Sequence, residues 1–367
     1  MSRRKFVKNS VAGVAATSVL STGLITSAPA IAQNRKELNI VSTWPRDFPG
    51  LGSSAQRLAQ RITDLSNGLI ETNYYAAGEK VGAFDVFDDV ASGNSEAYVA
   101  TDYYWKGKHP GFAYFATVPF GMINPEWNAW IKFRGGQELW DVLSGEFGIK
   151  ALACGGLGTQ MGGWFNKEIE SAEDFQGLKI RMPGLGGDVM AKLGASPIAL
   201  PGGQIYENLV SGAIDATEWV GPYNDYFMKF YDAAKYYYSP GMHEPGGGIA
   251  FGMNKEWWEK LSKLEQIIIE AACMEENAAQ PEEAIANNGE YLSKMVDEHG
   301  VELREFNDDV YDSFGEAAAE VFEEVRDHSE LAMKIDDSYQ KNLREMGSYL
   351  KLADIGYSNQ RNRVLGI

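Results

Sequence analysis

The chain has 367 residues, which at about 150 residues per domain favours two domains and allows a large apolar core. Its 33 basic and 51 acidic side chains give a net charge of −18, and such a charge repels nucleic acid and anionic lipid. We therefore exclude a nucleic-acid partner. Hydrophobic residues make up 44% and aromatic residues 12%, which is typical of a folded globular protein.

The first 32 residues predict an export signal. Arg3 and Arg4 are adjacent, and the apolar stretch 11–32 that follows contains glycine, serine and threonine. That stretch is too weakly apolar for a permanent membrane helix, so a cleavable signal similar to twin-arginine signals is the better interpretation. Small residues at 30 and 32 predict a mature chain that begins at Gln33. The predicted location is the periplasm.

Strands and helices alternate in the first part of the mature chain. The alternation of strands and helices predicts an α/β sheet with parallel strands. After the first strand, the loop 44–50 contains tryptophan, arginine and two prolines, and we interpret it as a functional loop. We expect strands at 38–42, 69–75, 97–100 and 149–154, and helices at 53–65, 83–92 and 128–143.

A second α/β unit begins near residue 162, and apolar chain returns to the first unit at 248–253. In this unit we expect strands at 164–165, 178–182 and 216–220, helices at 171–175, 186–193 and 204–211, and beyond it long helical patterns at 255–296 and 306–353. The pattern predicts a two-lobe α/β binding protein with a ligand cleft between hinged lobes and long C-terminal helices. The predicted parts are lobe 1 at 33–154 plus 248–300, lobe 2 at 155–247, and C-terminal helices at 301–367.

The glycine-rich run 155–163 is similar to a dinucleotide-binding loop but has Met161 where the third glycine is needed, and a strand-like pair follows it. We interpret it instead as a hinge that lets the backbone approach a ligand. The two cysteines, Cys154 and Cys273, lie in a predicted strand and a predicted helix, and we expect two separate buried thiols.

Catalytic motifs are missing. The sequence has no Gly-x-Ser-x-Gly, Cys-x-x-Cys or His-Glu-x-x-His motif, and its four histidines are scattered. His243 is the most interesting of them because Glu244 follows it, although a solvated loop histidine is the default interpretation. Since no acid–base or nucleophilic set assembles, we expect a protein that is not an enzyme.

Arg181 ends the predicted strand 178–182, so its guanidinium should project at the C-terminal edge of the sheet. Open α/β sheets bind ligands at that edge, and the arginine fork fits a carboxylate with two hydrogen bonds. On spacing alone, the alternative is a surface arginine at a strand end.

Glu218 lies in an apolar strand, where a carboxylate needs a cation or a set of hydrogen bonds. Gln160 and Glu244, in glycine-rich loops, would complete an all-oxygen site suited to Na⁺ or Ca²⁺, whereas Zn²⁺ would want the histidine or cysteine that this set lacks. Tyr103 and Tyr104, expected from the opposing lobe, offer aromatic surface and hydroxyl donors, although such clusters are more often core.

Three segments together carry a family resemblance: 177–181 (Gly-Leu-Lys-Ile-Arg), 200–206 (Leu-Pro-Gly-Gly-Gln-Ile-Tyr) and 211–222 (Ser-Gly-Ala-Ile-Asp-Ala-Thr-Glu-Trp-Val-Gly-Pro). The chain resembles the solute-binding proteins of tripartite ATP-independent periplasmic (TRAP) transporters over essentially its whole mature length. Its Glu-Trp and His-Glu-Pro-Gly signatures are similar to those of the branch for 2-oxo acids such as pyruvate.

The resemblance implies a role for each matching residue. Arg181 would hold the substrate carboxylate, and Gln160 would contact both the ligand and its cation. Glu218 and the backbone carbonyl of Trp219 would be further cation ligands. The resemblance also places Glu244 beside the cation, makes Tyr104 a ligand contact from the other lobe, and implies a homodimer formed through the helices at 306–353.

We therefore expect a periplasmic receptor that binds a small 2-oxo monocarboxylate, such as pyruvate or 2-oxobutyrate, with a bridging Na⁺ or Ca²⁺. It would deliver this ligand to TRAP membrane subunits without transforming it. Lactate or another 2-hydroxy acid remains an open alternative for the ligand. A periplasmic sensor or enzyme is the less favoured class.

Overall fold

The computed structural model describes residues 35–367, of which Lys36–Ile367 form one compact unit. The predicted export signal and its cleavage at Gln33 lie outside the described residues. Within residues 35–367, no helix combines the length and the apolar character that a bilayer span requires.

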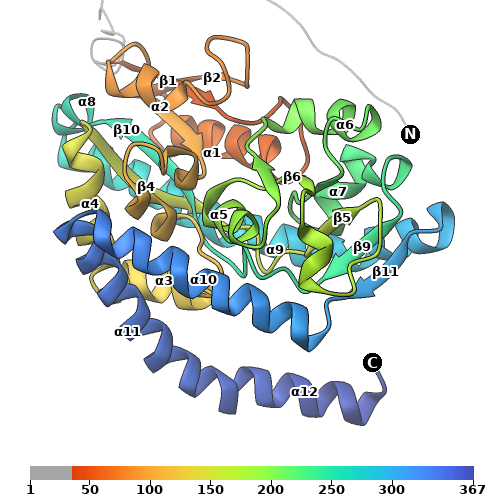
Figure 1. Cartoon of the computed structure of the whole chain (residues 1–367). Coiled ribbons are helices and arrows are strands. Elements are labelled where there is room, and N and C mark those ends of the chain that lie inside the picture. Colours follow the sequence, from red (N-terminus) through yellow and green to blue (C-terminus); the bar gives the residue numbers. More distant parts are fainter. Residues whose placement is uncertain (1–34) are drawn as a thin grey trace, which may run out of the picture. The chain divides into compact units, whose positions relative to one another are not determined.

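The first sheet has five strands in the order β2-β1-β3-β10-β4 (Figure 1). Its strands are β1 (Lys36–Ser42), β2 (Ile70–Tyr75), β3 (Ala97–Ala100), β4 (Ile149–Gly155) and β10 (Ile249–Asn254). β1 is parallel to β2 and β3, as predicted, but β10 is antiparallel to both β3 and β4. The expectation of a purely parallel sheet is wrong at β10, because this strand arrives from the second sheet and not through a helix packed on the first.

The second sheet has six strands in the order β11-β9-β5-β8-β6-β7. Its strands are β5 (Gly163–Phe165), β6 (Lys179–Arg181), β7 (Ser196–Ile198), β8 (Ala216–Thr217), β9 (Tyr236–Ser239) and β11 (Glu302–Glu305). β5 is antiparallel to β8 and β9, while the other pairs are parallel. The sequence pattern does not predict β7, β9 or β11, and the predicted strand 216–220 is shortened to β8.

Helices cover both sheets, and the prediction of a single helix at 128–143 is wrong. The pattern at 128–143 is two helices, separated at Gly135, whose φ of 87° lies in the left-handed region that glycine tolerates. In the first part of the chain the helices are α1 (Gly52–Leu65), α2 (Val86–Ala91), α3 (Asn124–Phe133), α4 (Gly136–Glu146), α5 (Gly184–Lys192), α6 (Gly202–Val210) and α7 (Pro222–Met228), with short 3₁₀ helices η2 (Asp102–Trp105), η3 (Pro110–Phe115), η4 (Ala172–Phe175) and η5 (Phe230–Asp232).

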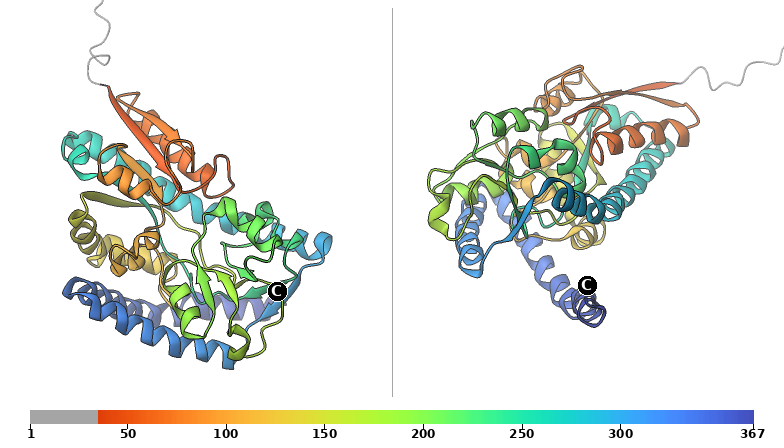
Figure 2. Two further views of the ribbon diagram at one scale, coloured as in Figure 1. Left: turned by 45° about the horizontal axis from the view of Figure 1, so that its top comes forward. Right: turned by 90° about the vertical axis from the view of Figure 1, so that its right-hand side faces the viewer.

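Beyond β10 the chain is mostly helical, and serine caps start two of its helices. Ser262 accepts a hydrogen bond from the Glu265 N–H before α9, and Ser329 accepts one from the Ala332 N–H before α11. α11 packs on η3, α3 and α4 (Figure 2), and α12 buries no residue. These helices are α8 (Lys255–Glu259), α9 (Lys263–His299), α10 (Asp308–His328), α11 (Glu330–Leu352) and α12 (Asp354–Leu365).

The chain passes between the sheets three times: at the two places that the sequence predicts, and again through α8 and α9 from β10 to β11. Residues 156–162 lead from β4 to β5, and residues 240–248 lead from β9 to β10; we call these segments the two crossings. Cys154 and Cys273 are both buried and both free, so the expectation of separate buried thiols is confirmed.

Candidate functional site

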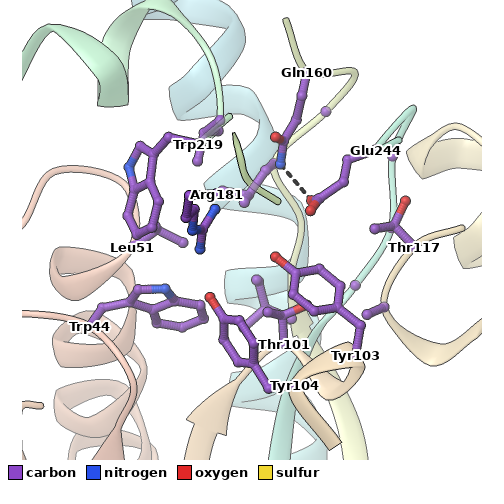
Figure 3. Close-up of a pocket in the computed structure, with 18 residues that line it drawn as sticks. Trp44, Leu51, Thr101, Tyr103, Tyr104, Thr117, Gln160, Arg181, Trp219 and Glu244 are labelled. Atoms are coloured by element: carbon purple, nitrogen blue, oxygen red, sulfur yellow. Dashed lines mark hydrogen bonds between the residues drawn. The ribbon is translucent and has the colours of Figure 1, made fainter. Parts of the chain in front are cut away.

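A cleft of about 440 Å³, counted with its open mouth, lies where the crossings, the ends of the second sheet and the loops of the first sheet meet (Figure 3). The cleft is lined by Trp44, Leu51, Thr101, Tyr103, Tyr104, Ala116, Thr117, Leu157, Gly158, Gln160, Arg181, Trp219, Val220, Glu244, Gly246, Gly247, Gly248 and Ile249.

Arg181 is the last residue of β6 and is 1% exposed, so the alternative of a surface arginine is wrong. Its Nη1 donates to a carboxylate oxygen of Glu218 and, at 3.1 Å, to the Glu218 carbonyl, while Nε donates to the Leu200 carbonyl at 3.2 Å. Nη2 is buried and has no partner in the described part of the chain. Burial is the largest single influence and lowers the pKa of Arg181, but Glu218, Tyr104, Tyr103 and Glu244 together outweigh it, so the pKa is raised.

Aromatic side chains surround the guanidinium. Trp219 lies against it, with the Arg181 Cζ 5.2 Å from the centroid of the ring. Figure 3 shows the Arg181 side chain pointing into the space between Trp219, Trp44 and Tyr104. Tyr104 is half-buried and Tyr103 is buried, and burial raises the pKa of both hydroxyls. The donor groups at this end of the cleft therefore stay protonated at neutral pH.

Gln160 and Glu244 form the other polar wall, one from each crossing. The Gln160 N–H donates to the Glu244 carbonyl at 3.0 Å, and Nε2 donates to the Glu244 Oε2 at 2.7 Å (Figure 3). The Oε1 of Gln160 is buried without a partner among residues 35–367. Burial, followed by repulsion from Glu218, raises the pKa of Glu244 well above its usual value.

Glu218 and His243 are both buried beside the cleft. Glu218 is 0% exposed but is not among the residues that line the cleft, and Arg181 already compensates one of its two oxygens. The free oxygen of Glu218, Oε2, lies 3.3 Å from Nε2 of His243. His243 is 3% exposed, so the default interpretation as a solvated loop histidine is wrong.

Glu218, His243 and Glu244 each present a ligand atom within 4.8 Å of the others. The expectation that this set contains no histidine is therefore wrong, because the second crossing folds His243 back over the end of β8. Together with Gln160, which donates a hydrogen bond to Glu244, the group forms a polar cluster in which oxygen is the main ligand atom. Such a donor set fits a hard cation.

All seven site residues predicted from the sequence lie in or beside this cleft, while some lining residues were missed. Trp44 belongs to the loop 44–50. The sequence indicated a functional loop there but did not single out the Trp44 side chain. Thr117, whose buried Oγ1 has no partner in the described residues, carried no signal in the sequence. Both come from loops on the first-sheet side of the cleft.

Residues 40–328 match the family of bacterial extracellular solute-binding proteins, family 7 (DctP). The chain belongs to this family. It is 32% identical to a monocarboxylate 2-oxoacid-binding periplasmic protein of Nostoc sp. strain PCC 7120, over 98% of each chain. The family and the α/β fold that the motifs predict are therefore confirmed.

Two solved structures extend the comparison. A TRAP transporter solute-binding protein of Bordetella bronchiseptica superimposes with a TM-score of 0.89 at 30% identity, over 90% of this chain and 98% of the other, and is described as a mixed-occupancy dimer with calcium and picolinate. A TRAP periplasmic solute-binding protein of Pseudoalteromonas atlantica, with sodium and pyruvate bound, superimposes at 0.86 and 34% identity, over 89% and 99%. This DctP-family chain is thus a TRAP solute receptor.

Proposed function

We propose that this receptor binds a small 2-oxo monocarboxylate, of the size of pyruvate or 2-oxobutyrate, together with a bridging Na⁺ or Ca²⁺. One observation carries the proposal. Among residues 35–367, the cleft wall combines a guanidinium nitrogen without a hydrogen-bond partner, Arg181 Nη2, with the unpartnered Oε1 of Gln160, and Oε2 of the adjacent Glu218 has no partner there either. Buried polar atoms without partners are costly, so a site built this way is completed by a ligand that supplies both kinds of partner.

The carboxylate end of the ligand would bind at Arg181. Nη2 is a charged donor aimed into the cleft, and the Nη1 that holds Glu218 lies on the same planar fork. Trp219 and Trp44 supply flat apolar surface on either side, and the Tyr104 hydroxyl supplies a further donor. Together these groups fit one carboxylate with a short apolar tail.

The cation would compensate the negative charge that a bound ligand brings into the cleft. Arg181 and Glu218 neutralise each other, so a bound monocarboxylate would add an unbalanced negative charge close to Glu218 and Glu244. A cation held by Gln160 Oε1, Glu218 Oε2 and the Trp219 carbonyl, with Glu244 beside it, would reverse that repulsion. These are the hard oxygen donors that Na⁺ and Ca²⁺ prefer.

The ligands of the two similar structures support the 2-oxo class. Pyruvate places a keto oxygen, and picolinate a ring nitrogen, on the carbon next to the carboxylate, so both molecules can hold one cation with two donor atoms. A keto oxygen is an acceptor only, whereas the hydroxyl of lactate also carries a proton. Because the bound cation repels that proton, we propose that 2-oxo acids bind more tightly than 2-hydroxy acids.

Calorimetry on the mature protein tests this function. Pyruvate and 2-oxobutyrate, titrated with Na⁺ or with Ca²⁺ present, are expected to bind, and chelator-treated protein in sodium-free buffer is expected to bind them at least tenfold more weakly. Zn²⁺ is included because His243 adjoins the site. A preference for a dicarboxylate or a sugar would contradict the ligand class, and unchanged affinity without either ion would contradict the bridge.

The proposal extends to the surroundings of the receptor. The family supports a receptor that delivers its ligand to TRAP membrane subunits from the periplasm, and we propose export by the twin-arginine route through the signal at 1–32. Replacing Arg3 and Arg4 by lysine should then block export, which periplasmic fractionation measures. We propose two lobes, one at 33–154 plus 248–300 and one at 155–247. β11 belongs to the predicted C-terminal segment 301–367, yet it pairs with the second sheet.

We also propose a homodimer formed through the C-terminal helices. α12 buries none of its residues against the described chain, and its exposed side chains include Ile355, Tyr357, Val364 and Leu365. An apolar surface of this kind is commonly covered by a partner. The similar Bordetella structure is described as a dimer.

A further inference from the structure

One side chain of the first-sheet side holds both crossings. Asn124, the first residue of α3, is 8% exposed and points between the crossings and not to solvent. Its Oδ1 accepts hydrogen bonds from the N–H of Gly158 at 3.0 Å and of Gly247 at 3.4 Å, and its Nδ2 donates to the Gly247 carbonyl at 3.0 Å. Asn124 thus makes hydrogen bonds to both crossings with a single side chain.

The glycines around Asn124 show how closely the crossings approach it. A Cβ on Gly156 would lie 1.9 Å from Asn124 Nδ2, and a Cβ on Gly246 would lie 2.4 Å from the Asn124 backbone nitrogen. Gly158 and Gly247 have φ values of 76° and 143°, in the left-handed region. The glycine-rich composition of both crossings is therefore explained in part by the space that Asn124 occupies.

The same crossings carry the polar wall of the cleft. Gln160 is two residues beyond Gly158, and Glu244 is three residues before Gly247. Between the anchor and the site, the Thr159 hydroxyl donates to the Pro245 carbonyl at 2.7 Å, and the Gln160 N–H donates to the Glu244 carbonyl at 3.0 Å. The crossings are thus tied to each other, and Asn124 ties the pair to α3.

We propose that Asn124 is a positioning residue for ligand binding, which anchors both crossings to α3 so that Gln160 and Glu244 are held together at the ligand end of the cleft. Two independent hinge strands would let the two residues separate as the lobes open. With one shared anchor, the crossings move as a pair and the polar wall stays assembled. The side chain acts without touching the ligand.

Asn124→Ala, compared with a matched variant, tests the proposal. Asn277 is also buried, at 3% exposed, and its Nδ2 donates to Asn128 at 2.7 Å without contacting either crossing. Both substitutions remove a buried amide and should lower the melting temperature. Asn124→Asp keeps the acceptor for Gly158 and Gly247 and should fall between Asn124→Ala and the unchanged protein in affinity.

Two readouts separate positioning from general stability. Hydrogen exchange in ligand-free protein should accelerate in both crossings of Asn124→Ala and in neither crossing of Asn277→Ala. Affinity for pyruvate with Na⁺ should fall about tenfold, or about 1.4 kcal/mol, in Asn124→Ala and stay unchanged in Asn277→Ala.

Exchange that changes in one crossing only, or in neither, would overturn the proposal. Faster exchange with unchanged affinity would also overturn it, because the anchor would then not position the site. The affinity arm depends on the proposed function and the exchange arm does not. If the unchanged protein does not bind pyruvate, the proposed function fails, and hydrogen exchange still decides whether Asn124 holds the two crossings together.

Discussion

Arg181 and Glu218 form a completely buried ion pair in which each partner uses only one side of its charged group. Nη1 of the arginine and one carboxylate oxygen are joined, while Nη2 and the other oxygen, Oε2, have no hydrogen-bond partner among the described residues. The ion pair is therefore neutral overall, while Nη2 remains available as a hydrogen-bond donor and Oε2 as an acceptor. It explains how one buried arginine can be stable without ligand and still present a free donor to the cleft.

We expect Arg181→Lys to weaken pyruvate binding by about 10- to 100-fold, or about 1.4 to 3 kcal/mol. Lysine keeps a positive charge near Glu218 but has no second nitrogen on a planar fork to reach the ligand. Calorimetry measures the change, with Arg134→Lys as the control, since Arg134 lies on the surface and bonds Asn342 and Glu345. Unchanged affinity in Arg181→Lys would show that another group holds the carboxylate.

Arg181→Ala should also lower stability, by about 3 to 5 kcal/mol, because it leaves Glu218 as an unpaired buried charge. Denaturant unfolding of the ligand-free protein measures this loss. The double variant Arg181→Met with Glu218→Gln should recover most of it, since both charges are removed together. A double variant that is as unstable as Arg181→Ala would show that the ion pair is not the source.

Glu218→Gln should remove most of the dependence of ligand affinity on Na⁺ or Ca²⁺. The amide keeps an acceptor for Arg181 but takes away the charge that would bind the cation. By linkage, the factor by which the ion strengthens ligand binding equals the factor by which the ligand strengthens ion binding, so both should shrink alike. Glu276→Gln is the control, because Glu276 is a buried glutamate paired with Arg57. The same ion requirement in Glu218→Gln would contradict this assignment.

Asp102 should make stability depend on pH. Burial raises its pKa from 3.8 to about 7, even though Tyr98 and Trp140 donate hydrogen bonds to it. The folded state therefore holds this proton more tightly than the unfolded chain does. The resulting stabilisation is complete below about pH 4 and is lost as the pH rises to 7, by about 4 kcal/mol at most.

Asp102→Asn should remove this part of the pH dependence, since an amide does not titrate. Denaturant unfolding at several pH values between 4 and 8 compares this variant with the unchanged protein. Asp297→Asn, at an exposed position on α9, serves as the control. An identical pH profile in Asp102→Asn would mean that the carboxyl stays ionised in its pocket, held by the two donors.

Truncation after Leu352 should convert the proposed dimer to a monomer without loss of the fold, because the removed α12 buries no residue. A cut further upstream would not be informative, since Ile335 and Tyr339 of α11 are buried in the core. Light scattering gives the mass, and the melting temperature and pyruvate affinity show that the truncated protein is intact. A truncated protein that remains dimeric would place the interface elsewhere.

Local sequence patterns were sufficient for much of this protein. β1 to β4, α1 and α5 follow from apolar periodicity and turn residues, which act within a few positions of the chain. The motifs around Arg181 and Glu218 indicated the family, and the strand end at Arg181 indicated where a carboxylate would bind. These features depend on neighbours in sequence, so the sequence alone was enough to predict them.

The tertiary structure decided what depends on distant partners. β10 runs antiparallel because it enters from the other sheet, and β9 and β11 are strands because residues 236–239 pair with 302–305. Very short strands of this kind carry little pattern of their own, and only the pairing with a distant segment makes them strands. Helix or strand propensity does not reveal such a partner.

The functional site, like the fold, has some features that the local sequence predicts and others that only tertiary contacts decide. The sequence by itself indicated Arg181, at a strand end, as a candidate for the ligand carboxylate, and Gln160 and Glu244, in glycine-rich loops, as candidates for a cation site. Only the tertiary structure decided that Glu218, 37 positions along the chain, is the partner of Arg181, and that His243 is buried beside it. The electrostatic field and the packing of groups remote in sequence decide whether a polar group is paired and which group it pairs with. These interactions exist only once the chain has folded.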